Sequence, residues 1–336
     1  MKVLLYTEGI KHISKSGLGK SLKHQMKALE ENDVEYTLDK KDDYDIVHIN
    51  FYGPNSYRLA KKAKKQGKKI VYHAHSTEED FRNSFIGSNL VSPLFKKWII
   101  KCYSLADHII TPTPYSKKLL KGYGIDVPIT AISNGIDMSF YEKNENYAET
   151  FRKAYGYRKT DKIIMAIGLY IERKGIIDFV ELAKRMPEYK FIWFGESPLY
   201  ASPKKVREAV KTKLPNLNFP GYVDPTIIRG ALSGASLYIF PTYEETEGMP
   251  VLEALTNKQN LIVRDIPVFD GWLKDGVNCH KAKDTDEFEL KIKQIIKGEH
   301  KDTTEEGYKV AHRKNIKNVG KNMKKIYEEL LKETKE

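Results

Sequence analysis

The chain has 336 residues, a formal net charge of +12, 40% hydrophobic residues and 30% charged residues. This length allows about two domains with separate cores, and no apolar run reaches the roughly 20 residues that a membrane-spanning helix needs. The two cysteines, Cys102 and Cys279, lie far apart and without metal-ligand spacing, which excludes a disulfide framework and a cysteine-based zinc site.

The positive charge is concentrated towards the N-terminus. Residues 1–140 contain 22 Lys and Arg against 15 Asp and Glu, a net charge of +7. Such a bias indicates a polyanionic partner, either nucleic acid or an anionic membrane, although solvated helix faces of a lysine-rich protein give the same count. The first residues, Met-Lys-Val-Leu-Leu-Tyr-Thr-Glu, place an acidic residue where a secretory signal would stay apolar. They predict a first strand and a cytoplasmic protein.

Strands and helices alternate along the chain. The strands expected in the first half are 2–8, 34–39, 45–51, 69–75, 108–113 and 129–133, with helices at 18–30 and 56–65. In the second half we expect strands at 163–169, 191–196, 217–222, 237–240 and 260–264, and helices at 176–185, 204–213, 226–234 and 250–257. This rhythm is typical of doubly wound parallel sheets. The sequence therefore predicts an α/β protein with two Rossmann-like domains.

The domain boundaries are expected in polar stretches. The predicted domains are 1–145 and 146–314, because 142–150 is polar and separates the two sets of strands. A last helix at about 315–332 carries apolar residues at helical spacing, which is enough to dock it on a core.

Two loops of the first domain carry candidate ligand-binding residues. Lys15-Ser-Gly-Leu-Gly-Lys-Ser21 opens a helix, and Gly17 would let the loop approach phosphate or sugar oxygens, although a simple helix-start turn explains it too. His73 and His75 end a strand and alternate to the same face, next to a polar loop. No third ligand stands nearby in the sequence, so the pair does not indicate zinc.

The segment 84–101 mixes apolar and basic residues in its helical part. Such a mixture is typical of a helix that lies in a lipid interface, and equally of an amphipathic helix that covers a sheet. The lysine run at 61–69 would strengthen contact with anionic lipids, or be a solvated helix face. The candidate membrane and acceptor residues are Phe95, Lys96, Lys97, Trp98 and Lys101.

Two carboxylates frame a turn after the short strand 237–240. Glu245 stands at the start of this turn and Glu253 in the helix that follows, with Gly248 and Pro250 between them. A carboxylate can accept hydrogen bonds from neighbouring sugar hydroxyls. The helix N-terminus lies at the carboxyl edge of a parallel sheet, where α/β folds bind ligands.

This stretch, Phe240-Pro-Thr-Tyr-Glu-Glu-Thr-Glu-Gly-Met-Pro-Val-Leu-Glu-Ala254, resembles the signature of the retaining nucleotide-sugar glycosyltransferases of family 4. The turn Asn134-Gly-Ile-Asp137 and the segment Ala166-Ile-Gly-Leu-Tyr-Ile-Glu-Arg-Lys-Gly175 are similar to further motifs of that family. The resemblance implies a GT-B fold, with two Rossmann-like domains facing a cleft and a C-terminal helix that crosses back to the first domain.

The resemblance also implies roles for single residues. Glu245, with the backbone near Gly248, Met249 and Pro250, would hold the donor hexose, and Glu253 its ribose. Lys174 would neutralise the diphosphate. Leu169 occupies the position of the family's arginine, so we expect Arg173 to supply the second cation.

Other positions in the resemblance belong to the rim of the site. Gly17 would face the cleft, and the segment that contains Gly221 and Tyr222 would surround the nucleotide base. A histidine at the end of the fourth strand approaches the donor sugar in the family. That role is assigned to His75, with His73 as the second choice.

The segments 75–85 and 173–180 are similar to bacterial synthases that add a second hexose to glucosyl-diacylglycerol, the anchor of lipoteichoic acid. The resemblance implies a peripheral enzyme on the inner face of the cell membrane, which transfers glucose or galactose from a UDP-sugar and forms an α linkage. Its expected partners are a UDP-hexose, a glycolipid acceptor and an anionic membrane. No metal is expected, because turn and cap roles explain the Asp-x-Asp pairs at 43–45 and 284–286.

Three alternatives remain at this point. A family-4 transferase could act on a capsule, teichoic acid or polyprenyl-linked acceptor, and a nucleotide-sugar epimerase could use the same two-domain plan. A basic nucleic-acid-binding protein is the third, but the sequence contains no recognition-helix or aromatic-platform motif, so no nucleic-acid partner is expected.

Overall fold

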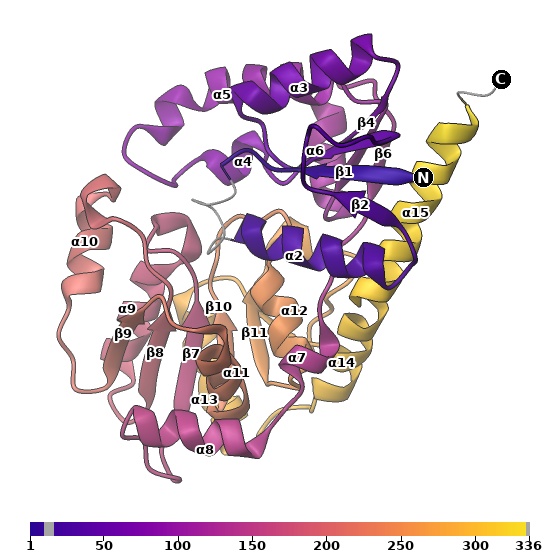
Figure 1. Ribbon diagram of the computed structural model, residues 1–336. Coiled ribbons are helices and arrows are strands. Elements are labelled where there is room, and N and C mark those ends of the chain that lie inside the picture. The colour runs from indigo at the N-terminus through magenta and orange to yellow at the C-terminus, as the bar shows by residue number, and fades with distance from the viewer. Residues whose placement is uncertain (10–16, 334–336) are drawn as a thin grey trace. The chain divides into compact units, whose positions relative to one another are not determined.

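The computed structural model describes residues 1–9 and 17–333 (Figure 1). The chain forms two compact units. Unit 1 comprises Met1–Phe81, Leu90–Asp137 and Lys314–Glu336, and unit 2 comprises Arg82–Asn89 and Met138–Arg313. The chain therefore contributes the short segment Arg82–Asn89 to unit 2, enters unit 2 again after Asp137 and returns to unit 1 at Lys314.

Unit 1 contains, within the described residues, a six-stranded parallel sheet in the order β2-β1-β3-β4-β5-β6. Its strands are β1 (Lys2–Tyr6), β2 (Glu35–Thr37), β3 (Ile46–Ile49), β4 (Lys69–His73), β5 (His108–Thr111) and β6 (Ile129–Ala131). Its helices are α2 (Gly17–Glu30), α3 (Pro54–Lys65), α4 (Glu78–Phe81), α5 (Ser88–Tyr103), α6 (Pro114–Gly122) and α15 (Ile316–Lys332).

Both faces of this sheet are buried, which explains why its strands are almost continuously apolar. Leu4 packs in one core cluster with residues of α3 and α5. Its neighbours Val3 and Leu5 point to the opposite face and pack with α2 and α15. The apolar residues of the last helix are buried in this second cluster, so α15 is part of the core of unit 1.

We expect Met323→Ala to lower the free energy of unfolding by about 2 to 4 kcal/mol, because Met323 is fully buried in α15 and its loss leaves a cavity. Urea unfolding measures the change. Asn322→Ala, at an exposed position of the same helix, is the control and should change stability by no more than about 0.5 kcal/mol. Equal effects of the two substitutions would show that α15 does not hold unit 1 together.

Unit 2 contains, within the described residues, a second six-stranded parallel sheet in the order β12-β11-β10-β7-β8-β9. The strands are β7 (Ile163–Ile167), β8 (Lys190–Phe194), β9 (Leu217–Gly221), β10 (Leu237–Phe240), β11 (Leu261–Arg264) and β12 (His280–Ala282). The α-helices are α7 (Met138–Tyr141), α8 (Glu145–Ala154), α9 (Ile176–Arg185), α10 (Lys204–Lys211), α11 (Pro225–Gly234), α12 (Met249–Thr256), α13 (Thr285–Lys297) and α14 (Thr304–Arg313). Short 3-10 helices are η1 (Glu172–Lys174), η2 (Leu199–Ala201) and η3 (Pro267–Phe269).

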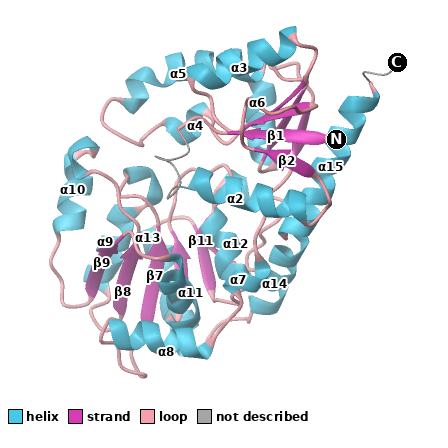
Figure 2. Cartoon of the chain, viewed as in Figure 1, coloured by secondary structure: helices cyan, strands magenta, loops and turns pink. Residues whose placement is uncertain are grey.

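The strand order of each sheet reverses at one place. In unit 2 the chain runs from β7 through β8 to β9 on one side, and from β10 through β11 to β12 on the other. In unit 1 the reversal lies between β1 and β3. Figure 2 shows the strands of each unit between helices. The predicted α/β class with two doubly wound parallel sheets is confirmed, and ligands of such sheets bind beyond the carboxyl ends of the strands at the reversal.

Candidate functional site

The loop after β7 brings two basic side chains to the reversal point of unit 2. It ends in η1, followed by Gly175 in the left-handed region with φ of 78°. A Cβ at this position would lie 2.2 Å from the carbonyl oxygen of Pro241, so only glycine lets the loop pack against the segment after β10. The Tyr243 amide donates to the Arg173 carbonyl at 2.8 Å and ties the two loops together. This packing sets Lys174 beside the neighbouring loop.

Lys174 and Glu245 form an ion pair in which the ammonium group donates to Glu245 Oε1. The hydroxyl of Thr242 lies 3.3 Å from the same oxygen. Both charged side chains are mostly buried, so water screens the pair less than it would a surface pair. A cation, a carboxylate and a hydroxyl at this edge can together bind a phosphate and sugar hydroxyls.

Arg173 is buried and holds the site's backbone. One guanidinium nitrogen donates to the Glu244 carbonyl at 2.7 Å, and Nε donates to the Ser84 hydroxyl at 3.4 Å. These contacts support a role in fixing the loop that carries Glu245, while direct contact with a diphosphate stays a prediction. Leu169, at the position of the family's arginine, is 47% exposed. Ser84 was not predicted as part of this site, because its segment, Arg82–Asn89, belongs to unit 2 although it lies between two segments of unit 1 in the chain.

The turn before α12 places the second carboxylate. Gly248 adopts φ of 85° and caps α12, with Pro250 in the first turn where no amide proton is needed. Glu253 is buried in this helix. Burial is the main cause that raises the pKa of Tyr238 well above its ordinary value, and the charges of Glu253 and Glu245 add to it. The two carboxylates therefore both lie near the end of β10, as their spacing in the sequence suggested.

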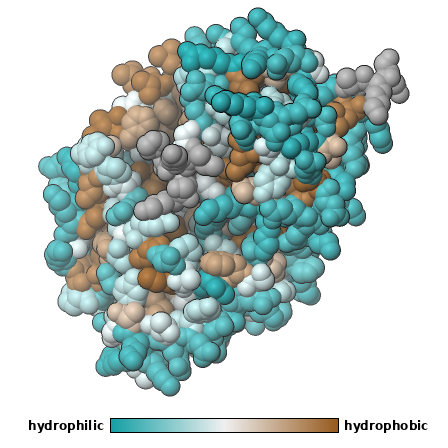
Figure 3. Space-filling model, in the orientation of Figure 1, coloured by the Kyte–Doolittle hydropathy of each residue, from teal (hydrophilic) through white to brown (hydrophobic). Residues whose placement is uncertain are grey.

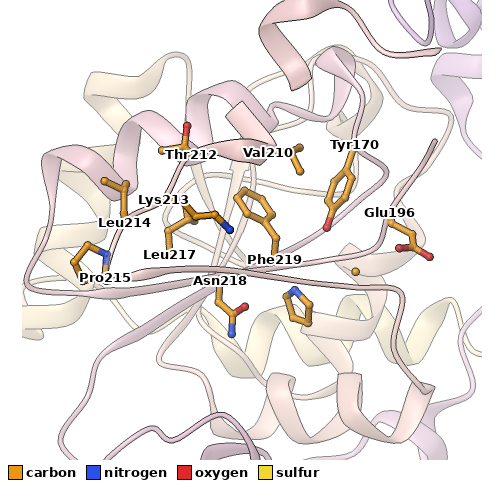
Figure 4. A pocket seen from close by; sticks show the side chains of 12 residues that line it. Tyr170, Glu196, Val210, Thr212, Lys213, Leu214, Pro215, Leu217, Asn218 and Phe219 are labelled. Atoms are coloured by element: carbon orange, nitrogen blue, oxygen red, sulfur yellow. The ribbon is translucent and has the colours of Figure 1, made fainter. Parts of the chain in front are cut away.

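A pocket of about 710 Å³ lies beside the edge strand β9 of unit 2 and reaches Tyr170 and Glu196 in the loops after β7 and β8. Figure 4 shows the rings of Tyr170 and Phe219 in its wall, and these two rings meet edge to face at 5.8 Å. Gly221 lines the pocket with φ of 77°, and a Cβ there would lie 2.9 Å from a carboxylate oxygen of Glu196. Tyr222, the other predicted residue of this loop, is exposed.

Unit 1 contains a stack of three histidine rings, one of which is the predicted residue His75. The rings of His73 and His75 are parallel, with centroids 4.2 Å apart. The ring of His48 stacks on that of His73, with centroids 5.3 Å apart. Asn50 Oδ1 lies 2.9 Å from His75 Nε2 and accepts from the Gln25 amide at 2.7 Å. His73 and His75 were predicted from the sequence, whereas Gln25, Asn50 and His48, which come from other elements, were not.

Burial lowers the pKa values of these histidines, to about 3 for His48 and well below the ordinary value for His73. At a pH below about 6.5 but above these lowered pKa values, the histidines bind protons in the unfolded chain and not in the folded chain. The free energy of unfolding therefore falls as the pH is lowered. We expect each of the two histidines to contribute about 1.4 kcal/mol per pH unit near pH 5. Urea unfolding at different pH values, detected through hydrogen exchange of the β3 and β4 amides, measures the change of unfolding free energy with pH. His48→Gln should reduce it by about one proton, and an unchanged slope would contradict the expectation.

Gly17 is the first residue of α2 and is exposed, whereas Lys15 and Ser16 of the same motif lie outside the described residues. Further along, α2 holds the turn at 134–137. Lys27 pairs with Asp137 at 2.7 Å, and the Ser21 hydroxyl donates to Asn134 Oδ1 at 2.9 Å. Gly135 takes φ of 77° in this turn.

Of the five residues expected to contact a membrane from α5, Phe95 and Trp98 face the protein. Phe95 stacks on Phe81 at 4.1 Å, and the Trp98 indole donates to the Tyr52 carbonyl at 2.7 Å, so both aromatic rings turn towards the protein. Lys96 pairs with Glu78 at 3.2 Å. The exposed face of α5 carries the expected Lys97 and Lys101, together with Leu90, Val91 and Leu94.

We call these five residues the α5 face. Leu90 is 84% exposed and Leu94 is 67% exposed. Figure 3 shows hydrophobic residues gathered over the N-terminal part of α5. The ammonium groups of Lys101 and of Lys61 on α3 both lie over the Tyr57 ring, at 5.3 and 5.7 Å, so basic residues of the two helices adjoin. Apolar and basic groups thus share one surface of unit 1.

The described residues contain no group of three or more His, Cys, Asp or Glu side chains that could hold a metal ion. The Asp-x-Asp pairs have structural contacts: Asp284 caps α13 by accepting from the Glu287 amide at 3.0 Å, and Asp45 accepts from the Lys2 amide at 2.8 Å. In the part of the chain that is described, no helix is long and apolar enough to cross a membrane.

Two parallel doubly wound sheets, with a basic loop and a pair of carboxylates at the reversal of the second, are typical of sugar-transferring enzymes of the GT-B class. Residues 20–140 match the model of Glycosyltransferase Family 4, and residues 148–323 match that of Glycosyl transferases group 1. The chain belongs to glycosyltransferase family 4.

Individual relatives narrow the comparison. The chain is 41% identical over 335 residues to the processive diacylglycerol alpha-glucosyltransferase of Acholeplasma laidlawii, covering 99% of both chains. It is 24% identical over 230 residues to the alpha-galactosylglucosyldiacylglycerol synthase of Streptococcus pneumoniae, covering 67% of this chain and 61% of that one. The crystal structure of Anabaena HepE with UDP-glucose has the same fold, with a TM-score of 0.78 at 14% identity, covering 98% of this chain and 100% of that one.

Proposed function

We propose that this chain transfers glucose from UDP-glucose to a diacylglycerol-based acceptor at a membrane surface and forms an α linkage with retention. The observation that carries the proposal is the cluster of Lys174, Glu245 and Thr242 at the reversal point of unit 2. The choice of glucose and of a diacylglycerol lipid is supported by the name of the relative that is 41% identical over nearly the full chain. Galactose is the alternative donor.

In this proposal, the residues of unit 2 bind the donor. Lys174 neutralises the charge that grows on the departing phosphate, and Arg173 keeps the loop in place for it. Glu253 binds the ribose, and Glu245 with the backbone from Gly248 to Pro250 binds the hexose hydroxyls. The pocket that Gly221 lines, next to Tyr222 in the chain, receives the nucleotide base.

The chemistry then needs only oriented groups. The acceptor hydroxyl attacks the anomeric carbon on the face from which the diphosphate departs, and the departing phosphate oxygen takes the hydroxyl proton. No side chain forms a covalent intermediate in this scheme, and no metal takes part in it. For His75 we keep the role that the resemblance to family 4 gives it, a hydrogen bond to a hydroxyl of the transferred hexose.

We further propose that the α5 face attaches the protein to the inner leaflet of an anionic membrane. Leucine side chains enter the acyl boundary while lysines stay with the lipid phosphates. The aromatic residues Phe95 and Trp98 support the helix from behind through their contacts in unit 1.

A transfer assay tests the proposed reaction. Purified protein is incubated with radiolabelled UDP-glucose or UDP-galactose and with anionic liposomes that contain diacylglycerol or glucosyl-diacylglycerol, with and without EDTA. Label from UDP-glucose in an extracted lipid, despite EDTA, is the expected result, and the number of hexoses per lipid shows whether transfer is processive. Transfer only to a soluble or polyprenyl-linked acceptor would overturn the lipid assignment.

The double substitution Leu90→Ser and Leu94→Ser should weaken binding to anionic liposomes by about tenfold or more, because two exposed apolar side chains are lost from the interface. Liposome sedimentation measures the binding. Leu290→Ser is the control, because Leu290 is 57% exposed on α13 of unit 2. Equal binding by both variants would exclude the α5 face as the membrane contact.

A further inference from the structure

A chain of buried polar contacts in unit 1 joins the C-terminal helix to His75. The Tyr327 hydroxyl of α15 lies 2.5 Å from His48 Nδ1, and His48 Nε2 lies 3.2 Å from His73 Nδ1. Gln25 Nε2 lies 3.1 Å from the same His73 nitrogen. Gln25 in turn contacts Asn50, which contacts His75 Nε2. The five contacts come from α2, α15 and the ends of β3 and β4.

The chemistry of each group restricts the proton positions of the next. An amide NH₂ group only donates, so His73 Nδ1 accepts from Gln25 and carries no proton. His48 Nε2 must then carry a proton and donate to the same His73 nitrogen. His48 Nδ1 is left without a proton and must accept. The Tyr327 hydroxyl is the donor that it faces.

The same reasoning extends from Gln25 to His75. Gln25 donates to Asn50 Oδ1, so this oxygen also accepts from His75 Nε2, at 2.9 Å. His75 therefore carries its proton on Nε2 and leaves Nδ1 as an acceptor. A nitrogen with a lone pair is suited to receive a hydrogen bond from a sugar hydroxyl.

The opposite arrangement would require every member to reverse. Gln25 and Asn50 would turn their amides, both ring protons of His48 and His73 would move, and His75 would donate from Nδ1. Tyr327 would then accept from His48, and its own proton would face Met323 Sδ at 3.9 Å, which is a weak acceptor. Tyr327 thus favours the first arrangement.

Burial supports the importance of these proton positions. It lowers the pKa of His48 and of His75 to about 3 and raises the pKa of Tyr327, so all three groups are neutral near pH 7. A neutral imidazole has one donor and one acceptor nitrogen, and the partner of one nitrogen decides the role of the other.

We propose that Tyr327 is a positioning residue that, through His48, His73, Gln25 and Asn50, fixes the proton of His75 on Nε2. The consequence for the reaction rests on the proposed function, because His75 acts there on the hexose. The C-terminal helix then does more than complete a core: it selects the hydrogen-bonding form of a side chain at the far end of the contact chain.

The test uses the full chain and nitrogen NMR of ¹⁵N-histidine-labelled protein, with the His75 signals assigned from a His75→Asn sample. In the unmodified protein we expect His75 to show a proton on Nε2 alone. Tyr327→Phe keeps the ring but removes the hydroxyl, and should give a mixture of the two tautomers. Its kcat should fall about three- to tenfold. Tyr103→Phe is the matched control, since Tyr103 is buried in the same unit and donates to the Ser76 carbonyl at 3.1 Å instead.

Gln25→Met provides a second variant that breaks the chain in its middle, from a different helix, in case Tyr327→Phe does not fold. A His75 proton on Nδ1 in the unmodified protein, or a single Nε2 tautomer in both variants, would overturn the proposal. The NMR measurement needs no substrate. If the tautomer changes as expected but the protein transfers no hexose, the contact chain stands and the proposed function fails.

Discussion

Replacing Lys174 with methionine should lower kcat/KM for hexose transfer by at least about 100-fold. In the proposed reaction, negative charge grows on the diphosphate as it departs, and Lys174 is the cation that the loop after β7 directs at the edge of the sheet. Leu169 supplies no charge there, and the guanidinium of Arg173 is engaged by the Glu244 carbonyl and the Ser84 hydroxyl. Steady-state kinetics with UDP-glucose and lipid acceptor measure the loss.

Stability must be separated from catalysis in this variant. Removing Lys174 leaves the buried carboxylate of Glu245 without its cation, which can destabilise a protein by about 3 to 5 kcal/mol. The double variant Lys174→Met with Glu245→Gln removes both charges, so it should recover most of the stability while remaining inactive. Lys205→Met is the control, because Lys205 pairs with Glu172 nearby in a more exposed contact. A Lys174→Met protein that stays within threefold of normal activity would contradict the proposed role.

The grouping of Lys174, Glu245 and Glu253 in unit 2 was predictable because the segments that carry them are local in the sequence. The turn with Gly248 and Pro250 sets the start of α12, and helical spacing then determines where Glu253 lies relative to Glu245. Lys174 precedes Gly175, whose positive φ the turn needs. The reversal of strand order, which the structure shows, brings these two segments to neighbouring strands.

The orientation of α5 could not be predicted in the same way. A helix with apolar residues on more than one face does not reveal which face meets the sheet. The contacts that decide it come from elsewhere, since Tyr52 accepts from Trp98 and Phe81 stacks on Phe95. Those contacts turn the aromatic residues inward and leave Leu90 and Leu94 exposed.

The surroundings of His75 were hidden for a related reason. Gln25 and Tyr327 are separated from His75 by 50 residues or more, and neither belongs to a recognisable motif. Their relation to His75 arises only when α2 and α15 pack on one face of the sheet of unit 1. Sequence patterns of the last helix predicted that it would dock on a core, but gave no sign that its tyrosine would contact a histidine.

Gly175→Ala should destabilise unit 2 by about 3 kcal/mol or more and abolish hexose transfer. The substitution puts a Cβ at positive φ, which costs on the order of 1 to 3 kcal/mol, and forces it against the carbonyl oxygen of Pro241, 2.2 Å away. Relief requires the loops after β7 and β10 to separate, and that movement would also displace Lys174 from Glu245. The clash and the loss of the site therefore have one cause.

Gly276→Ala separates the two contributions to this effect. Gly276 also has positive φ, at 64°, but no atom lies within 4 Å of a Cβ built there, so its variant suffers backbone strain alone, about 1 kcal/mol. Urea unfolding of both variants gives the cost of the clash as their difference, and the transfer assay shows whether activity follows it. Equal destabilisation by the two substitutions would mean that the contact of Gly175 with Pro241 is not what holds the two loops together. Activity lost only in Gly175→Ala would tie the positions of Lys174 and Glu245 to that single close approach of backbone atoms.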